Sequence, residues 1–341
     1  MKPKKYADII DVANQAGVSP ATVSRCFNHP DKVRPDTRRR IKTAVESTGY
    51  IRNRAAQAIH GRRSGTVGLI VPTLDNAIFS NLIQAFSEQL NASGFTMLVA
   101  THGYDLDREY QLLRSLLEHR VEGIGLIGLD HKEETYSLIE RRETPSVAMW
   151  NYRPDTRISC VGADNYEAGR MIARHILDIG HKRVALVFPD IEGNDRAAYR
   201  LKGVQDVFDE QKIDVPKNWH LHTPYSIKHA RRVCTPLLSS EDKPTAIIAG
   251  NDVIAQGVIY AAQALGFKVP NRISVAGIGD FSGSAHLLPS LTTIRLRSNK
   301  VGQTAGMILD KLINGDQENH IERVAIGVEL MQRQSTAHPF T

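Results

Sequence analysis

The apolar positions of residues 8–28 recur at the spacing of two short helices joined by a tight turn. The inward positions of these helices are Ile9, Val12, Ala16, Val23 and Phe27. Asp8 and Ser19 precede the helices as N-cap residues, and Gly17 stands where the first helix has to end in a left-handed residue. The pattern predicts a helix-turn-helix, although an ordinary helical hairpin on a protein surface has the same periodicity.

The outward face of the second helix carries small and hydrogen-bonding side chains around one arginine. With the cap residue, this predicted DNA-contacting set is Ser19, Pro20, Ala21, Thr22, Ser24, Arg25 and Asn28. A recognition helix meets base edges in the major groove with the residues near its N-terminus. Residues 35–48 predict a third helix with basic residues mostly outward, and Arg34 precedes it in place of a residue that caps well.

The charge of the chain is concentrated at its start. Residues 1–63 contain fourteen Lys and Arg against five Asp and Glu, a formal charge of +9, whereas the whole chain of 341 residues is +6. The remainder is therefore slightly acidic. A basic head on an acidic body indicates that the head binds a polyanion such as DNA.

From residue 66 onward, apolar runs typical of buried strands alternate with amphipathic helical stretches. The predicted strands are 67–71, 96–100, 123–129, 146–150, 184–188, 246–249 and 274–278. The predicted helices are 79–93, 110–119, 166–179, 200–211, 228–238 and 253–265. This alternation predicts parallel sheets covered by helices on both faces, and the run is long enough for two sheets.

Polar and aromatic residues gather beyond the carboxyl ends of these strands, where open α/β sheets bind ligands. The candidate ligand-binding residues are Asp75, Phe79, Trp150, Asn151, Asp164, Arg196, Arg200, Tyr225, Asn251 and Asp280. Aromatic faces with convergent hydrogen-bonding groups suit a sugar-like ligand, although each residue alone could equally be a loop residue or a helix cap. We expect His102, His131 and His181 to be ordinary loop histidines, because their spacing indicates neither a metal site nor a catalytic base.

The sequence gives little support for other classes of protein. Gly123, Gly125 and Gly128 match a dinucleotide-binding pattern, but they lie inside a predicted strand instead of opening a helix. The alternative of a sugar-acid enzyme on a two-lobed fold lacks a P-loop, a Ser/His/Asp set or a metal cluster. Three widely separated cysteines indicate no disulfide framework, and no apolar run approaches the roughly 20 residues that span a bilayer. We expect a cytoplasmic protein with no cofactor, no signal peptide and no membrane partner, which disfavours an exported binding protein.

Residues 8–64 closely resemble the headpiece of the lactose-repressor (LacI/GalR) family of bacterial transcription regulators. The matching segments are 11–13, 16–19, 22–25, Asn28, 37–38, 49–50 and 53–57. The resemblance continues more weakly over the rest of the chain. It implies an all-α helix-turn-helix headpiece and a two-lobed α/β effector domain of the periplasmic-binding-protein type I fold, with doubly wound parallel sheets.

The resemblance also implies domain boundaries. The expected parts are a headpiece at 1–50, a hinge helix or linker at 51–64, a first lobe at 65–163 with 293–324, and a second lobe at 164–292 with 325–341. The crossings between the lobes are expected near Ala163, Thr292 and Val324.

In the family, the hinge helix folds when two copies pair over the DNA minor groove. The corresponding contacts here are Asn53, Ala56 and Ile59, and Ile59 replaces the leucine that the family wedges between base pairs. A flexible basic linker is the alternative for residues 51–64.

The family's effector-contacting positions correspond here to Phe79, Trp150, Arg200, Tyr225 and Asn251. Many members have an aspartate where this chain has Gly279, which we expect to leave space without adding negative charge, while Arg196 and Arg200 remain. Residues 193–196 look most like the gluconate-type repressors. We therefore expect a homodimeric repressor that binds a palindromic operator in double-stranded DNA and responds to a sugar acid such as gluconate.

Overall fold

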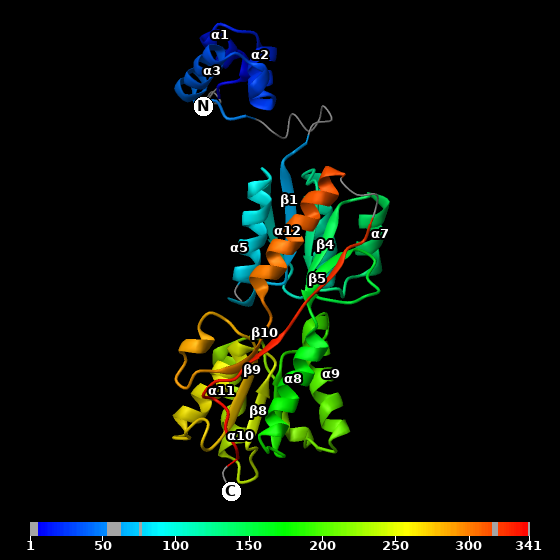
Figure 1. Cartoon of the computed structure of the whole chain (residues 1–341), viewed down its shortest axis with the longest axis vertical. Coiled ribbons are helices and arrows are strands. Elements are labelled where there is room, and N and C mark those ends of the chain that lie inside the picture. The colour runs from blue at the N-terminus through cyan, green and yellow to red at the C-terminus, as the bar shows by residue number, and fades with distance from the viewer. Residues whose placement is uncertain (1–5, 53–62, 75–76, 316–319, 340–341) are drawn as a thin grey trace, which may run out of the picture. The chain divides into compact units, whose positions relative to one another are not determined.

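The computed structural model describes residues 6–52, 63–74, 77–315 and 320–339. The chain divides into two compact units, Met1–Ser64 and Gly65–Thr341 (Figure 1). The first unit is helical, and the second is built from parallel sheets and helices.

The first unit packs three helices around a small core. As the periodicity predicts, they are α1 (Ile9–Ala16), α2 (Pro20–Asn28) and α3 (Pro35–Thr48), with a 3-10 turn, η1 (Pro30–Lys32), between the last two. The buried core residues are Val12, Ala13, Ala16, Val23, Ile41 and Ala44. Ile9 and Phe27, which the pattern also places inward, are partly buried against this core.

Local capping explains where these helices begin and end. Asp8 accepts hydrogen bonds from two backbone N–H groups of α1 at 2.8 and 3.0 Å, and Ser19 accepts one from α2 at 3.2 Å. Gly17 ends α1 with a φ of +63°, a conformation that glycine adopts without steric cost. α3 begins after Arg34, whose side chain makes no capping hydrogen bond. The third helix therefore lacks a contribution of about 1 kcal/mol that an N-cap supplies.

The second unit holds two six-stranded sheets in the orders β11-β5-β4-β3-β1-β2 and β12-β10-β9-β8-β6-β7. The strands of the first are β1 (Thr66–Val71), β2 (Thr96–Thr101), β3 (Ile124–Ile127), β4 (Ser146–Asn151), β5 (Ser159–Ala163) and β11 (Arg323–Ile326). The strands of the second are β6 (Val184–Phe188), β7 (His220–His222), β8 (Ala246–Ala249), β9 (Ser274–Gly279), β10 (Thr292–Arg295) and β12 (Glu329–Met331). The pairings between the described strands are parallel, except that of β10 with β12, which is antiparallel.

Each sheet and its helices form one lobe (Figure 1). The first lobe contains α5 (Ala77–Ala92), α6 (Leu106–Glu118), α7 (Glu133–Arg141) and α12 (Ser298–Asn314). The second contains α8 (Asn165–Asp178), α9 (Asp195–Glu210), α10 (Ile227–Ser239), α11 (Asp252–Ala264), η2 (Lys217–Trp219) and η3 (Ser284–His286). The two-lobed, doubly wound α/β fold is thus confirmed. None of the described helices is long and apolar enough to cross a membrane.

The chain passes between the lobes after β5, after β10 and after β11. The expected crossings near Thr292 and Val324 are therefore a few residues early. Residues 292–295 pair with β9 in the second sheet, and residues 323–326 pair with β5 in the first. The cause is that each crossing continues directly from an extended strand, so the apolar pattern does not mark its start.

The pattern does not predict β5, β7, β10, β11, β12, α7 or α12. Several of these strands are only three or four residues long, and β11 and β12 have partly exposed residues, so none forms a long apolar run. α9 begins at Asp195, five residues before the predicted start at Arg200. Its first turns bury polar residues, so apolar periodicity does not mark the start of this helix.

Candidate functional site

The N-terminal half of α2 presents most of the predicted DNA-contacting residues to solvent. The exposed members are Ser19, Pro20, Ala21 and Arg25, and the partly buried ones are Thr22 and Ser24. The Ser19 and Thr22 hydroxyls lie 2.9 Å apart and bond to one another. Small side chains therefore surround the exposed Arg25 guanidinium, as direct contact with base edges requires.

Asn28 differs from the other members of the set because its carboxamide is used within the protein. Its Nδ2 donates to the Ser24 carbonyl oxygen at 2.8 Å, and its Oδ1 accepts from Arg52. The Arg52 guanidinium also lies over the Phe27 ring, 5.5 Å from its centroid. Asn28 thus joins the end of α2 to residue 52, at the start of the expected hinge.

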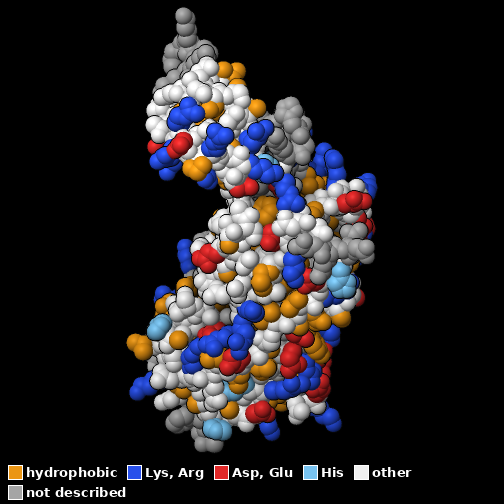
Figure 2. Space-filling view, turned by 45° about the horizontal axis from the view of Figure 1, so that its top comes forward, with side chains coloured by type: hydrophobic (Ala, Val, Ile, Leu, Met, Phe, Trp, Pro, Cys, Tyr) orange, Lys and Arg blue, Asp and Glu red, His pale blue; other side chains and the backbone are white. Residues whose placement is uncertain are grey.

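The basic residues of α3 lie on the surface of the first unit. Arg38, Arg39, Arg40 and Lys42 are all exposed, and Figure 2 shows Lys and Arg side chains spread over the visible face of this unit. Exposed cations of this kind bind phosphate groups without reading sequence. Asn53, Ala56 and Ile59, the predicted hinge contacts, lie outside the described residues.

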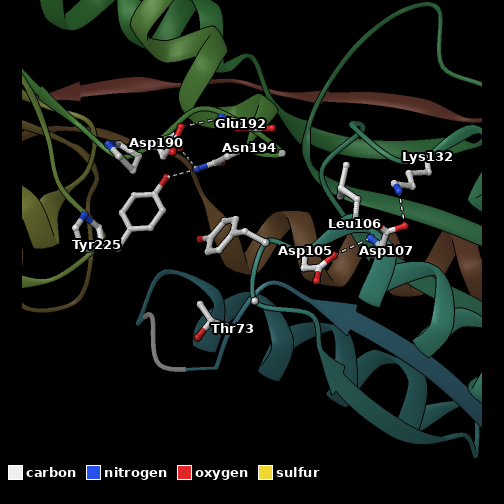
Figure 3. Close-up of a pocket in the computed structure, with 14 residues that line it drawn as sticks. Thr73, Asp105, Leu106, Asp107, Lys132, Asp190, Glu192, Asn194 and Tyr225 are labelled. Carbon is white, nitrogen blue, oxygen red and sulfur yellow. Dashed lines mark hydrogen bonds and ion pairs between the residues drawn. The ribbon is translucent and has the colours of Figure 1, made fainter.

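The carboxyl ends of both sheets converge on a pocket of about 860 Å³ between the lobes (Figure 3). Its walls are the loops that follow β1, β2 and β3 in the first lobe and β6 and β7 in the second. The lining residues include Tyr104, Asp105, Lys132, Asp190, Asn194 and Tyr225. Of the ten predicted ligand-binding residues, only Tyr225 is among the described lining residues, and Asp75 lies outside the described part of the chain.

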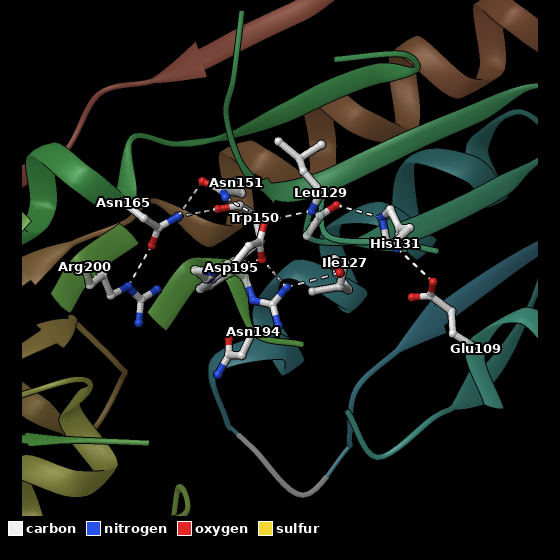
Figure 4. A network of polar contacts seen from close by, with 12 residues as sticks. Glu109, Ile127, Leu129, His131, Trp150, Asn151, Asn165, Asn194, Asp195 and Arg200 are labelled. Carbon is white, nitrogen blue, oxygen red and sulfur yellow. Dashed lines mark hydrogen bonds and ion pairs between the residues drawn. The ribbon is translucent and has the colours of Figure 1, made fainter. Parts of the chain in front are cut away.

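A buried polar network connects the lobes beside this pocket (Figure 4). Asp195, at the start of α9, accepts hydrogen bonds from the Leu129 backbone N–H at 2.8 Å and from Asn151 Nδ2 at 2.7 Å. Arg196 donates to the Ile127 carbonyl oxygen at 3.2 Å. We call these contacts of Asp195 and Arg196 with the first lobe the inter-lobe contact. Arg196 is therefore a bridge between the lobes.

Arg200 lies one helical turn further along α9 and is 1% exposed. Its Nε donates to Asn165 Oδ1 at 2.7 Å and its Nη1 to the Gly250 carbonyl oxygen at 3.1 Å. Its Nη2 has no hydrogen-bond partner in the described structure. Burial lowers the pKa of Arg200, because it removes the solvent that normally stabilises the cation.

Two further buried polar atoms near these residues are unpaired among the described residues. Asn251 is fully buried and caps α11 with its Oδ1, which accepts from the Ile254 backbone N–H at 3.0 Å, while its Nδ2 has no partner. Asn194 Oδ1 likewise has no partner. Buried polar groups in proteins are almost always hydrogen-bonded, so unpaired donors and acceptors beside a pocket indicate the place of a ligand.

Aromatic residues form two pairs at this site. Phe79 and Trp150 make an edge-to-face contact with centroids 5.7 Å apart, and Trp150 adopts a φ of +83°, a strained conformation for a bulky residue. Tyr104 of the first lobe and Tyr225 of the second lie 6.2 Å apart, and Asn194 Nδ2 donates to the Tyr225 hydroxyl at 3.1 Å. The second pair spans the two lobes at the pocket.

Two predicted ligand-binding carboxylates are occupied with protein partners. Asp164 is exposed and caps α8, and its neighbour Asn165 occupies the buried network in its place. Asp280 accepts hydrogen bonds from Arg295 at 2.7 Å and Arg333 at 2.6 Å. These ion pairs engage both of its carboxylate oxygens.

The expectation that Gly279 leaves space for a ligand is wrong. A Cβ at this position would lie 2.3 Å from Phe281 Cε1, and the φ of +144° also disfavours a side chain. The Phe281 ring fills the space that an aspartate side chain would need. This contact could not be read from the sequence, because it depends on how the turn after β9 folds back.

His102, His131 and His181 lie in loops as expected, but all three are buried. His102 and His131 lie beside Glu109, and His181 contacts Thr245 and Ser274. No group of three or more potential ligands within the described residues could hold a metal ion.

The sequence search missed two residues that bind across the lobes, Tyr104 and Asp195. Asp195 lies directly between Asn194 and Arg196, and Tyr104 follows the end of the predicted strand 96–100 by four residues. The rule that selected the other candidates, a polar or aromatic residue beyond a strand end, would have included Tyr104.

Comparisons with known proteins agree with this architecture. The family model "Bacterial regulatory proteins, lacI family" matches residues 8–53, and the "Periplasmic binding protein-like domain" matches residues 173–336. The HTH-type transcriptional repressor PurR of Salmonella paratyphi A is 28% identical over 334 residues, which cover 97% of each protein.

Two solved structures extend the comparison. The transcription regulator GntR from Chromobacterium violaceum is 30% identical with a TM-score of 0.74, over 80% of this chain and 99% of that one. The lac repressor dimer bound to operator and the anti-inducer ONPF is 24% identical with a TM-score of 0.84, over 98% and 100% of the two chains. The chain therefore belongs to the lacI family of bacterial regulatory proteins, a family of transcription regulators and not of enzymes, and it is a DNA-binding transcriptional repressor with an effector-binding domain.

Proposed function

We propose that this repressor controls its operator in response to a sugar acid, such as gluconate, bound between the lobes. The observation that carries the proposal is the pair of unpaired buried donors, Arg200 Nη2 and Asn251 Nδ2. Arg200 Nη1 bonds to the carbonyl oxygen of Gly250, the residue before Asn251, so the two side chains belong to one neighbourhood. A carboxylate offers the acceptor oxygens and the negative charge that such a neighbourhood lacks.

The rest of a sugar acid also has partners here. Its hydroxyl groups can donate to Asn194 Oδ1, the unpaired acceptor at the pocket, and its carbon chain can lie against the rings of Tyr104 and Tyr225. A neutral sugar would satisfy the acceptor but would leave the buried Arg200 cation without a counter-charge. We therefore infer that the acid binds more tightly than its neutral counterpart.

For DNA, we propose a homodimer that binds a palindromic operator. Pro20, Ala21 and Arg25 of each α2 face base edges, and the cations of α3 contact phosphates. The hinge positions Asn53, Ala56 and Ile59 enter the minor groove, where Ile59 wedges between base pairs. The proposal includes a cytoplasmic location, where the operator is accessible.

Effector and operator are coupled because one bound molecule contacts both lobes. A ligand shifts the population toward the lobe arrangement that it binds better, and reciprocity requires that the operator in turn change the effector affinity. A change in the arrangement of the lobes would alter the spacing of the two hinge segments in a dimer.

The test is titration calorimetry of the full chain with gluconate, glucose and hypoxanthine, the last being a planar neutral ring that the tyrosine pair could stack on. Asn251→Asp is the informative variant, because aspartate caps a helix as well as asparagine does but replaces the unpaired donor with an acceptor. We expect the wild type to bind gluconate most tightly. Asn251→Asp should weaken gluconate binding at least tenfold and should change glucose binding little.

A wild-type preference for glucose or hypoxanthine would remove the sugar-acid proposal, as would an unchanged gluconate affinity in the variant. Anisotropy of a labelled operator with and without gluconate then measures the coupling. The repressor assignment does not depend on this outcome.

A further inference from the structure

Glu109, His102 and His131 form a buried titratable cluster in the first lobe, and Figure 4 shows Glu109 and His131 pointing toward one another. The His131 and Glu109 side chains are 0% and 1% exposed. His131 Nδ1 lies 2.8 Å from Glu109 Oε1, and His131 Nε2 lies 3.0 Å from the Gly128 carbonyl oxygen. Nothing in the effector or DNA sites uses this cluster directly.

The geometry fixes the number of protons on the pair. Both ring nitrogens of His131 face oxygen atoms, and a carbonyl oxygen can only accept a hydrogen bond. A neutral imidazole has a single N–H, so with an ionised Glu109 it would leave one lone pair directed at another. Two protons satisfy both contacts, either as imidazolium with carboxylate or as neutral imidazole with carboxylic acid. The pair therefore holds one proton more than a neutral imidazole and an ionised carboxylate would hold together.

This proton supports the loop that meets the second lobe. His131 anchors Gly128, and the Tyr136 hydroxyl donates to the Leu129 carbonyl oxygen at 2.7 Å. The backbone N–H of Leu129 in turn donates to Asp195, in the inter-lobe contact. The loop is thus held on one side by the buried pair and on the other by α9.

We propose that Glu109 and His131 are positioning residues that hold the inter-lobe contact through a shared proton, so that loss of this proton opens the lobes. The inference goes beyond the sugar-acid proposal, because it concerns the lobes of the unliganded protein. It makes the closed arrangement of the effector domain sensitive to pH in the range where the pair titrates.

The groups around His131 together raise its pKa. Burial lowers the pKa of His131, but the hydrogen bond and charge of Glu109, the charge of Asp195 and the Gly128 carbonyl raise it, and the net shift is upward. Tyr136 faces the ring edge-on at 5.5 Å. His102 adds little positive charge, because burial lowers its pKa and keeps it neutral near pH 7.

The remaining contacts of His102 fit this assignment. Its Nδ1 lies 3.3 Å from the Asp105 carbonyl oxygen, to which it donates, and its Nε2 lies 3.8 Å from Glu109 Oε2, beyond hydrogen-bonding distance. The positive charge of Arg196 also lowers the pKa of His102. Glu109 therefore shares a proton with His131 and not with His102.

The sign of the pH effect follows from the raised pKa of His131. The stabilisation of the closed lobes is fully present below the ordinary histidine pKa and is lost as the pH rises through the raised value. Between these two pH values, the opening equilibrium grows by up to tenfold per pH unit, because opening releases one proton.

Hydrogen–deuterium exchange of the peptide spanning residues 124–132 tests the inference on the full chain without ligand. Protection factors, corrected for intrinsic exchange, should fall by up to roughly tenfold per pH unit in wild type above the ordinary histidine pKa. His131→Gln should remove this slope, because glutamine does not titrate. Glu109→Gln should keep one hydrogen bond but reverse the slope, so that protection falls as the pH drops below the ordinary histidine pKa, because burial then dominates and lowers the pKa of His131.

His181→Gln is the matched control. His181 is also buried. Its Nε2 faces the Ala337 carbonyl oxygen at 2.9 Å, and its other partners are the hydroxyls of Thr245 and Ser274, which donate or accept as required. A single N–H therefore satisfies its geometry, with no extra proton. The control should retain the wild-type slope at residues 124–132. Wild-type protection that does not change with pH would overturn the inference, and so would a wild-type slope in His131→Gln. Nitrogen NMR of the wild-type ring, in which His131 should titrate above the ordinary histidine value, decides the matter if the variants do not fold.

Discussion

Two arginines of this repressor, Arg25 on α2 and Arg200 on α9, show how differently its two binding regions are built. Arg25 is exposed on a short helix, surrounded by small side chains that leave it accessible. Arg200 is 1% exposed and held by Asn165 and the Gly250 carbonyl, and its Nη2 has no partner among the residues that the structure describes. In the proposed roles, the first is a surface group that DNA must reach, and the second is fixed in advance for a small ligand.

The difference teaches where the energy of each interaction comes from. A surface cation gains little from a single contact in water, so the headpiece needs many of them and its binding weakens with salt. A buried cation has already lost its hydration on folding, so one well-placed carboxylate restores a large interaction. Substitutions in the two regions should therefore differ in size and in salt dependence.

The largest effect is expected for Arg200→Ala. Removing the cation leaves a buried carboxylate of the effector without its partner, which costs about 2–5 kcal/mol of binding free energy. Lys202→Ala is the matched control, because Lys202 lies on the same helix but is exposed and forms its ion pair with Asp206 at the surface. Calorimetry with gluconate should separate the two variants, and thermal unfolding should show whether Arg200→Ala retains the fold. Equal gluconate affinities in a folded Arg200→Ala and in Lys202→Ala would show that the buried cation does not bind the effector.

The headpiece could be predicted from the sequence because its determinants are local. The spacing of Val12, Ala16 and Val23 defines the inward face, and Ser19 and Gly17 mark the helix ends through contacts within a few residues. Each of these signals acts over one or two turns of chain. The outward face of α2 follows from the inward one.

The cleft could be predicted only in part because its determinants are distant in sequence. The strand-end rule found Arg200, Asn251 and Tyr225, but not that Asp195 contacts Leu129, 66 residues away. It also could not show that the Phe281 ring fills the space beside Gly279. Convergence of loops from two lobes is a tertiary property, and no periodicity along the chain encodes it.

A smaller effect is expected for Arg25→Ala, which tests the exposed half of the comparison. Loss of a base contact should cost about 1–3 kcal/mol of operator binding and relax the preference at one base pair in each half-site. Anisotropy with the operator and with single-base variants measures both quantities. If affinity instead fell by the same factor for every sequence, Arg25 would contact a phosphate and the proposed orientation of α2 would be incorrect.

The smallest effect is expected at Arg34, where the headpiece carries a cation in place of a helix cap. The backbone of Arg34 has a φ of −56° and a ψ of 141°, close to the extended geometry of a cap, but its side chain makes no capping hydrogen bond. Arg34→Ser should supply that bond and stabilise α3 by about 0.5–2 kcal/mol. Arg34→Ala removes the same charge without adding a cap, so the difference between the two variants isolates the capping contribution. Calorimetric unfolding of the full chain should show the headpiece melting higher in Arg34→Ser than in Arg34→Ala, while both lose the same modest, salt-dependent part of their operator affinity. Equal melting temperatures would mean that α3 is held by its packing alone, and unequal losses of operator affinity would mean that residue 34 contributes to DNA binding by more than its charge.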